Sequence, residues 1–426
     1  MKKFKLAIAA LAASMSVNVF SPLTAQAQEE PVEISFWHAM NGPHQDMITE
    51  LVEGFNGSQD QYVVVEQNQG DYSSLQQSIM ASGVSGDLPT MSQLTNSNTP
   101  DFREQGLLTS LDAYLTDENG WTDELKDGIF EGFMTGVTYD DGIYAIPFSK
   151  SVRLMFVNQD LLDEVEAEIP TTWAEVQALG EAMDEAGLEE EAMGLENSIS
   201  MEVETMARQN GATWVADDLS EVEIASETAI EPVQFVKDLI DNGHARQAGE
   251  DGFMSGPFSQ GASALYIGSS AGLPHVLPGI EENGINLTTA ELPVFNDGEK
   301  LTLFAGNDLG VFESASEEER AGAAAFLAYL LEGENTAKWA IGTGYLPITQ
   351  AGLDSDLWQD YLAENPLVEA ASTELDYGQS QVPYVGSSEV FSEIELAIEN
   401  IMINDADIQA EMQGIEDLVK GHIGVE

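Results

Sequence analysis

Strand-like and helix-like segments alternate along the N-terminal part of the chain. Residues 32–37 (Val-Glu-Ile-Ser-Phe-Trp) alternate between apolar and polar side chains, as a half-buried strand does. Helical spacing follows over 44–56, and the pattern then continues as strand 62–67, helix 72–82 and strand 90–94. Strands separated by single helices in this way predict an α/β unit with a largely parallel sheet.

A second α/β unit follows. Residues 171–186 are amphipathic, and Thr172 and Glu175 have the spacing of a capping box at a helix start. No internal repeat and no long linker separates the two units, so we expect two α/β lobes joined by several extended crossings. Further helices are expected at 110–115, 124–133, 231–242, 317–331, 336–341, 389–402 and 405–419, a strand at 264–268, and extended chain at 142–157 and 301–312, the latter with a break at Gly306-Asn307.

The N-terminus predicts export. A basic start (Met1 to Lys5) precedes a short apolar stretch, and Ala25-Gln26-Ala27 is a small-x-small cleavage site, so residues 1–27 have the pattern of a signal peptide. The apolar stretch is too short to anchor the chain in a bilayer. The absence of cysteine excludes a lipid-anchored form, disulfides and thiol catalysis. We therefore expect a soluble protein of the periplasm.

The charge balance is strongly acidic, with 75 Asp and Glu residues against 14 Lys and Arg. Self-repulsion of this size destabilises a compact state at low ionic strength, whereas ~1 M salt shortens the Debye length to roughly 3 Å. The composition predicts a halophilic protein of a salty habitat and disfavours nucleic-acid or anionic-membrane partners. The acidic runs at 189–191 and 317–319 are typical of solvated faces, so we predict no metal site.

Catalytic and cofactor motifs are almost absent. The chain has no dinucleotide fingerprint, no phosphate-binding loop and no His-Glu-x-x-His, and its five histidines lack metal-ligand spacing. One short match exists: Gly268 to Gly272 has the nucleophile-elbow pattern around Ser270, although Pro274 fits the following helix poorly. These observations favour a binding protein without a cofactor over an enzyme, and leave a secreted hydrolase as the alternative.

Candidate binding residues cluster where extended segments pass between the lobes. Lys150 and Arg153 bring two basic side chains close together in a chain that otherwise avoids them. On a strand Ser151 and Arg153 would share one face, with Lys150 on the other. A cation there suits an anionic or strongly polar solute, and the alternative is pairing with nearby carboxylates. Two further segments are candidates. Ser269 and Ser270 offer hydroxyl and backbone N–H groups to a solute, and the alternative is that they cap a helix. Trp37 and His38 end the first strand, and the alternative is that they belong to the core.

Several motifs resemble a known family. Phe-Trp-His-Ala-Met-Asn-Gly at 36–42 is similar to the opening of the glycerol-3-phosphate-binding proteins of bacterial ABC importers. The resemblance continues, in the same order and with similar spacing, over nearly the whole mature chain. It implies membership of the extracellular solute-binding superfamily, which includes maltose-binding proteins. The further matching motifs lie at 70–72, 146–151, 269–270 and 344–349.

The resemblance implies a two-lobed periplasmic binding protein fold with hinge crossings and an interlobe cleft. The N-lobe would hold 28–147 plus 304–342, and the C-lobe 148–303 plus 343–426. A monomer of this kind closes on its solute and docks on ABC permease subunits that work with an ATPase. The cleft residues carried over by position are Tyr72, Asn96, Ser151, Ser270, Gly306 and Tyr345, to which their placement adds His38, Lys150, Arg153 and Ser269.

The chain also departs from the family pattern. Asn96 stands where an acidic residue is expected, Asn197 and Ser200 fall near the positions of paired tryptophans, and residues 386–388 replace an expected arginine. Loss of an arginine removes a bidentate partner for phosphate, which Lys150 or Arg153 could replace. The expected solute is glycerol-3-phosphate, a glycerophosphodiester or a related sugar or polyol. A neutral sugar or compatible-solute glycoside is the alternative, and a sensory role for the same closed form stays open.

Overall fold

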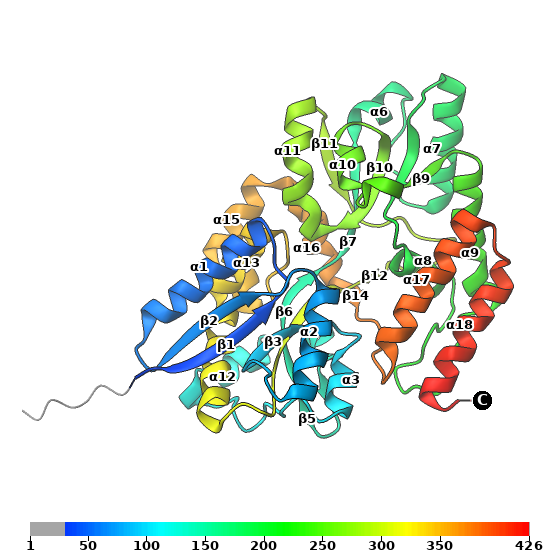
Figure 1. The fold of residues 1–426 in the computed structure, drawn as a ribbon. Coiled ribbons are helices and arrows are strands. Elements are labelled where there is room, and N and C mark those ends of the chain that lie inside the picture. The colour runs from blue at the N-terminus through cyan, green and yellow to red at the C-terminus, as the bar shows by residue number, and fades with distance from the viewer. Residues whose placement is uncertain (1–29, 426) are drawn as a thin grey trace, which may run out of the picture.

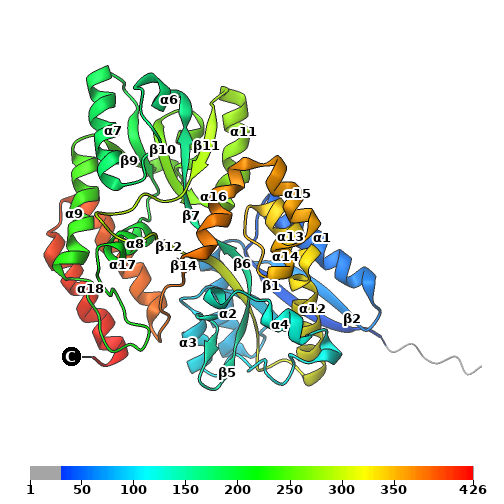
Figure 2. The same cartoon turned by 180° about the vertical axis from the view of Figure 1, so that it is seen from behind.

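The chain folds into two lobes, each built around a five-stranded sheet (Figure 1). Figure 2 shows the same arrangement from behind, with the second lobe above the first. The computed structural model describes residues 30–425, so the predicted signal peptide lies outside the described residues. The α/β architecture predicted from the alternation of strands and helices is confirmed.

The first sheet mixes parallel and antiparallel pairs. β1 is parallel to its neighbours β2 and β3, while β13 is antiparallel to β3 and β6. The sequence pattern predicts a largely parallel sheet; the β1–β2 and β1–β3 pairs fit this prediction, and the two antiparallel pairs of β13 do not. In sheet order the strands are β2 (Tyr62–Asn68), β1 (Val32–His38), β3 (Met91–Leu94), β13 (Ala305–Val311) and β6 (Ala145–Ser151).

Helices cover this sheet because each has one apolar face. In α1 (Pro43–Ser58), Ile48, Leu51, Val52 and Phe55 are buried. The ring of Phe326, on α12 (Glu317–Leu331), lies 5.1 Å from that of Phe55. The Asp71 side chain accepts a hydrogen bond from Ser74 N (2.7 Å) and so caps the start of α2. The other helices of this lobe include α2 (Tyr72–Ser85), α3 (Thr99–Glu104) and α13 (Gly333–Thr343).

The second sheet is also mixed, with β10 parallel to β8 and antiparallel to β7. Its strands in order are β11 (Leu287–Ala290), β7 (Arg153–Asn158), β10 (Ser263–Ser269), β8 (Glu191–Leu195) and β9 (Ala245–Gln247). The predicted capping box between Thr172 and Glu175 is present at the start of α7. The helices of this lobe include α6 (Gln159–Glu164), α7 (Trp173–Ala186), α8 (Ser200–Gln209), α9 (Glu227–Asp241), α10 (Ser255–Ser259), α11 (Leu273–Asn283), α17 (Ser387–Asn404) and α18 (Ile408–Ile423).

The chain passes between the two sheets more than once. β6 ends at Ser151 in the first sheet and β7 begins at Arg153 in the second, so the first crossing is at Val152. The chain returns between β11 and β13, where the short strands β12 (Thr302–Leu303) and β14 (Gly378–Gln379) pair. It crosses again between α15 (Asp356–Glu364) and α16 (Glu369–Thr373). Helices α14 (Gln350–Leu353) and α15 pack on α13 of the first lobe, whereas α16 contacts β7 and β11 of the second. The predicted lobe boundaries stay a proposal.

Two predicted surface helices are wrong. Residues 110–115 form turns, because Leu111 N donates to Ile143 O (2.8 Å) and ties this segment to the neighbouring chain. The helix predicted over 124–133 is divided into α4 (Asp123–Asp127) and α5 (Glu131–Met134). The chain between them pairs with a distant segment, where Gln350 N donates to Gly128 O (2.8 Å) and Ile129 bridges Thr349. Tertiary pairing overrides local helical preference at both places.

Candidate ligand-binding site

A cleft of about 750 Å³ lies between the lobes. The first lobe contributes Tyr72, at the start of α2, and Tyr345, just after α13. The second contributes Arg153, at the start of β7, and Ser269, at the end of β10. Side chains from both lobes therefore face one space. The other lining residues are Glu196, Asn197, Ser198, Ser200, Met201, Glu202, Gly252, Phe253, Ser255, Tyr266, Ala271, Gly272, His275, Gln381, Phe391 and Glu395.

Two tyrosines form the wall on the first lobe. Asn307 Nδ2 donates to the Tyr72 hydroxyl (2.8 Å), which also shares a hydrogen bond with the Tyr345 hydroxyl. The Tyr345 ring stacks on Trp339, with ring centroids 5.8 Å apart and planes 8° apart. Burial raises the pKa of both phenols, so each stays neutral and can donate or accept hydrogen bonds. This wall offers rigid rings with fixed polar ends.

The opposite wall is built around an ion pair. Arg153 Nε donates to Glu202 Oε1 (2.6 Å), and Arg153 Nη2 lies 2.5 Å from the same oxygen. Burial disfavours the charged guanidinium, but the Glu202 carboxylate opposes this effect, and the net result is a raised pKa for Arg153. Arg153 stays positively charged at any physiological pH, with its charge balanced by Glu202.

Two further carboxylates line this wall. Glu196 follows β8, and it accepts hydrogen bonds from the Tyr266 hydroxyl and from Met254 N (2.9 Å). Burial, reinforced by the charge of Glu196, raises the pKa of Tyr266, so this phenol remains a donor. Glu395, on α17, accepts from Ser198 Oγ (2.7 Å). The cleft is thus lined by more acidic than basic side chains.

Four of the predicted site residues meet in this cleft: Tyr72, Arg153, Ser269 and Tyr345. Asn197 and Ser200, noted in the sequence near the positions of paired tryptophans, line it as well. Ser269 Oγ accepts a hydrogen bond from Ala271 N (3.2 Å), which is the cap geometry that the sequence allowed as an alternative to binding. Whether these side chains touch a solute stays a prediction.

Three predicted residues lie in the strands that join the lobes. Lys150 is buried, and its Nζ lies 2.5 Å from Asp308 Oδ1, as in the ion-pair alternative. Ser151 is buried at the end of β6. Gly306 has a φ of 111°, and a Cβ there would lie 1.8 Å from the Ser149 carbonyl oxygen. These three lie in β6 and β13, next to the crossing at Val152, and among the described residues they do not line the cleft.

His38 and Asn96 are also outside the lining. His38 is fully buried at the end of β1, where its Nε2 lies 3.4 Å from Glu66 Oε2 and its Nδ1 accepts from Met40 N (3.2 Å). Asn96 donates to Gln381 O (2.9 Å), which links the loop after β3 to the chain before α17. Both side chains support the loops around the cleft in this arrangement.

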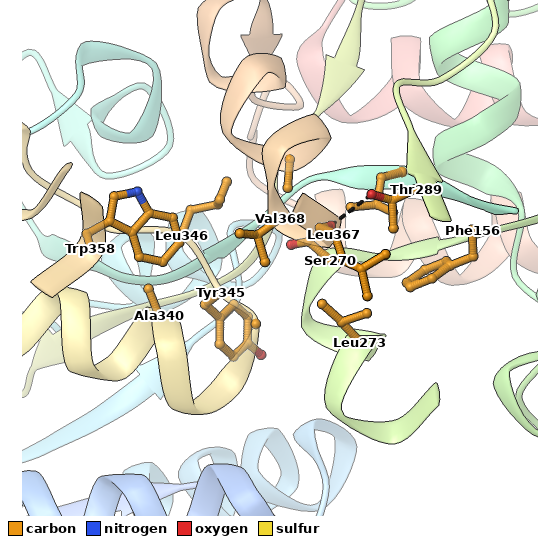
Figure 3. A pocket seen from close by; sticks show the side chains of 13 residues that line it. Phe156, Ser270, Leu273, Thr289, Ala340, Tyr345, Leu346, Trp358, Leu367 and Val368 are labelled. Carbon is orange, nitrogen blue, oxygen red and sulfur yellow. Dashed lines mark hydrogen bonds between the residues drawn. The ribbon is translucent and has the colours of Figure 1, made fainter. Parts of the chain in front are cut away.

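Ser270 lies behind the cleft, at a small apolar cavity (Figure 3). Its hydroxyl is buried and has no hydrogen-bond partner among residues 30–425. The volume that the centre of a water-sized sphere can occupy in this cavity is only about 10 Å³. Figure 3 shows Leu273, Val368 and Tyr345 around it. Thr289 Oγ1 donates to Leu367 O at its edge (2.8 Å). A space of this size is close to the minimum for one water, so it cannot hold a solute.

Sequence reasoning missed several lining residues, including Glu196, Glu202 and Tyr266. One signal could have found the first. Glu196 directly follows β8, which is parallel to its neighbours β10 and β9, and ligands of α/β sheets bind beyond the carboxyl ends of such strands. Phe253, Gln381 and Glu395 carry no comparable local signal, because distant segments bring them to the cleft.

A sequence profile of the family described as bacterial extracellular solute-binding protein matches residues 50–366. The chain belongs to this family. A glycerol-3-phosphate-binding periplasmic protein, UgpB, of Rhizobium meliloti is 26% identical over 366 residues, covering 83% of each chain. UgpB of Yersinia pseudotuberculosis is 24% identical over 385 residues, covering 87% of this chain and 86% of the relative.

Solved structures have the same fold as this family member. UgpB from Mycobacterium tuberculosis, solved in complex with glycerophosphocholine, has a TM-score of 0.80 at 22% identity and covers 92% of this chain and 98% of its own. A cyclic maltosyl-maltose-binding protein from Arthrobacter globiformis has a TM-score of 0.77 at 23% identity, covering 92% and 99%. No helix in the described part of the chain is both long enough and apolar enough to cross a membrane.

Proposed function

We propose that this protein is the periplasmic receptor of an ABC importer for a polyhydroxylated solute: glycerol-3-phosphate, a glycerophosphodiester or a related sugar or polyol. The observation that carries the proposal is the cleft of about 750 Å³ lined by residues of both lobes. Clefts of this size enclose small solutes, and a site between two lobes binds best when they close. Membership of the solute-binding family and the names of the relatives support this reading.

The strands between the lobes supply the hinge. Only Val152 separates β6 of the first sheet from β7 of the second, so a small backbone rotation there would move one wall of the cleft against the other. A solute that contacts both walls binds the closed form better and therefore shifts the population towards it. We propose that the receptor is a monomer and that permease subunits coupled to an ATPase recognise its closed form. We also propose that a signal peptide directs its export and is cleaved off near residue 27.

A hydrolytic role finds little support in the geometry. The nucleophile-elbow candidate, Ser270, is 4% exposed, and its Oγ has no hydrogen bond to a histidine or carboxylate among the described residues. A catalytic serine needs such a base within hydrogen-bonding reach. The proposed receptor accordingly has no chemistry of its own and returns its solute unchanged.

Small-angle X-ray scattering with and without solute tests the proposal. The exported protein in ~2 M KCl would be measured with glycerol-3-phosphate, glycerophosphocholine, maltose and a glycerol glycoside, and solutes would be recovered afterwards. We expect a smaller radius of gyration and a higher melting temperature with at least one of them, and chemically unchanged solute. Turnover would support the hydrolase, and the absence of any binding would contradict the receptor.

A further inference from the structure

One carboxylate oxygen in the cleft lacks a partner. Glu202 is 3% exposed and lines the cleft, yet its Oε2 accepts no hydrogen bond within residues 30–425. Its Oε1 accepts both contacts from Arg153. An unpaired buried acceptor is costly, so native structures place a donor, water or ligand there. Glu202 Oε2 can therefore accept a hydrogen bond from a solute hydroxyl that reaches it when the lobes close on the solute.

The neighbouring charges restrict which solutes can approach. Besides its tyrosines, which stay neutral, the ionisable lining consists of three carboxylates (Glu196, Glu202 and Glu395), one guanidinium (Arg153) and His275. With His275 neutral the lining carries two net negative charges. A phosphate group would add to this charge in a space that loses its water when the lobes close, and like charges repel more strongly where water is excluded.

Within residues 30–425 no Lys and no second Arg lines the cleft to offset this charge. Lys150, the second basic side chain of the hinge segment, is buried against Asp308 and does not line the cleft. Arg208, on the neighbouring α8, contacts Glu204 and Gln379 instead. A phosphate bound at the remaining N–H groups of Arg153 would lie beside the Glu202 carboxylate, whose negative charge repels it.

We propose that the Arg153–Glu202 pair is the specificity-determining element of the cleft, and that it selects hydroxyl groups of a solute without net negative charge and rejects phosphate monoesters. This inference rests on the proposed receptor function and narrows it to one substrate class. It also separates this protein from the relatives named for glycerol-3-phosphate, whose ligand is an anion.

Hydroxyl groups fit the pair because each can both donate and accept. One hydroxyl can donate to Glu202 Oε2, and a neighbouring one can accept from Arg153, because a guanidinium has more N–H groups than the two that contact Glu202 Oε1. The apolar face of a sugar or polyol can then lie on Phe253, which is 72% exposed at the cleft. These contacts leave the Arg153–Glu202 pair intact.

The salt dependence of binding tests the proposal in the unaltered protein. Calorimetry would compare glycerol-3-phosphate (anionic), glycerophosphocholine (zwitterionic) and a glycerol glycoside (neutral) at 0.3 M and 2 M KCl. We expect glycerol-3-phosphate to bind at least about 100-fold more weakly than the best solute without net charge. Its residual binding is expected to strengthen with salt, because screening weakens repulsion.

Glu202→Gln supplies the matched variant, with Glu185→Gln on the exposed face of α7 as a control for the same charge change. We expect Glu202→Gln to weaken binding of the uncharged solute by about 10- to 100-fold, the size of a hydrogen bond to a charged group. It is expected to improve binding of glycerol-3-phosphate, while Glu185→Gln changes neither.

The outcomes distinguish this inference from the proposed function. Tight binding of glycerol-3-phosphate that weakens with salt would overturn the inference and leave the receptor function standing. Unchanged selectivity in a folded Glu202→Gln variant would also overturn it. If no solute in the set binds or closes the lobes, the proposed function fails and the inference fails with it. The salt comparison needs no variant, so poor folding of Glu202→Gln does not affect it.

Discussion

His44 and His275 lie edge to face between the two lobes, with ring centroids 5.5 Å apart and planes at 73°. His44 belongs to α1 of the first lobe, and its Nε2 lies 3.0 Å from the Thr343 carbonyl oxygen. His275 belongs to α11 of the second lobe and lines the cleft. Burial and the proximity of His275 lower the pKa of His44 below its ordinary value of 6.5, although the Thr343 carbonyl partly opposes them.

This pair predicts a pH dependence of lobe closure. In the window below 6.5 a state in which His44 is exposed and apart from His275 binds more protons than this arrangement, because burial and His275 lower the pKa of His44 here. The contribution to stability is therefore complete above about pH 6.5 and is lost as the pH falls through this window. We expect solute affinity to fall by about 2- to 5-fold from pH 7.5 to 5, as measured by calorimetry.

His275→Gln should weaken this dependence, since it deletes the neighbouring charge that lowers the pKa of His44, while burial, the larger cause, remains. His422→Gln, on α18, is the matched control and is expected to keep the pH profile of the unaltered protein. Identical pH profiles for His275→Gln and the unaltered protein would show that the pair does not sense pH.

The Lys150–Asp308 pair predicts an asymmetric mutational response. Both side chains are almost fully buried, at 7% and 0% exposure, so removing one leaves a charge without compensation. We expect Lys150→Met to lower the free energy of unfolding by about 3–5 kcal/mol, and the double variant Lys150→Met/Asp308→Leu to recover most of it. Chemical denaturation in ~2 M KCl measures both.

An exposed ion pair provides the comparison. Lys300 and Glu291 contact each other with side chains that are 57% and 28% exposed, and Lys300→Met is expected to cost less than about 1 kcal/mol. Equal losses for Lys150→Met and Lys300→Met would mean that burial does not govern the hinge pair.

The backbone conformation at position 306 is predicted to require glycine. Its φ of 111° is unfavourable for other residues, and a Cβ would lie 1.8 Å from the Ser149 carbonyl oxygen on the paired strand. Gly306→Ala is expected to cost more than about 2 kcal/mol, because both strain and the separation of β6 from β13 contribute. Gly187→Ala, at a φ of 75° with open space around it, is expected to cost about 1 kcal/mol. A Gly306→Ala variant as stable as Gly187→Ala would contradict this.

The acidic composition predicts stabilisation by salt. With 75 acidic and 14 basic residues, self-repulsion is expected to dominate the charge energetics at low ionic strength. We expect the melting temperature to rise between 0.1 M and 2 M KCl, where the Debye length falls from about 10 Å to well below that. The chloride salt is used because sulfate would also strengthen the burial of apolar surface, and that effect would be mixed with charge screening. A flat or falling curve would contradict the halophilic interpretation.

Local signals predicted the fold well. The alternation of strands and helices over 32–94 predicted parallel pairing, which β1–β2 and β1–β3 have, and the Thr172–Glu175 spacing predicted the capping box of α7. These features depend on side chains close in the chain, so sequence periodicity reveals them. The failure over 124–133 has the opposite cause, since Gly128 and Ile129 pair with residues near 350.

The sequence alone determined the fold class, the acidic surface and the candidate cluster around Lys150 and Arg153, because each follows from composition or from neighbours in the chain. Only the tertiary structure decided what those two cations do. Their partners, Asp308 and Glu202, come from distant segments that folding brings within 2.5 Å of each cation. The same chain crossings placed Lys150 in the hinge and Arg153 in the cleft. Charge neutralisation depends on distance in space, and no spacing along the chain encodes that distance.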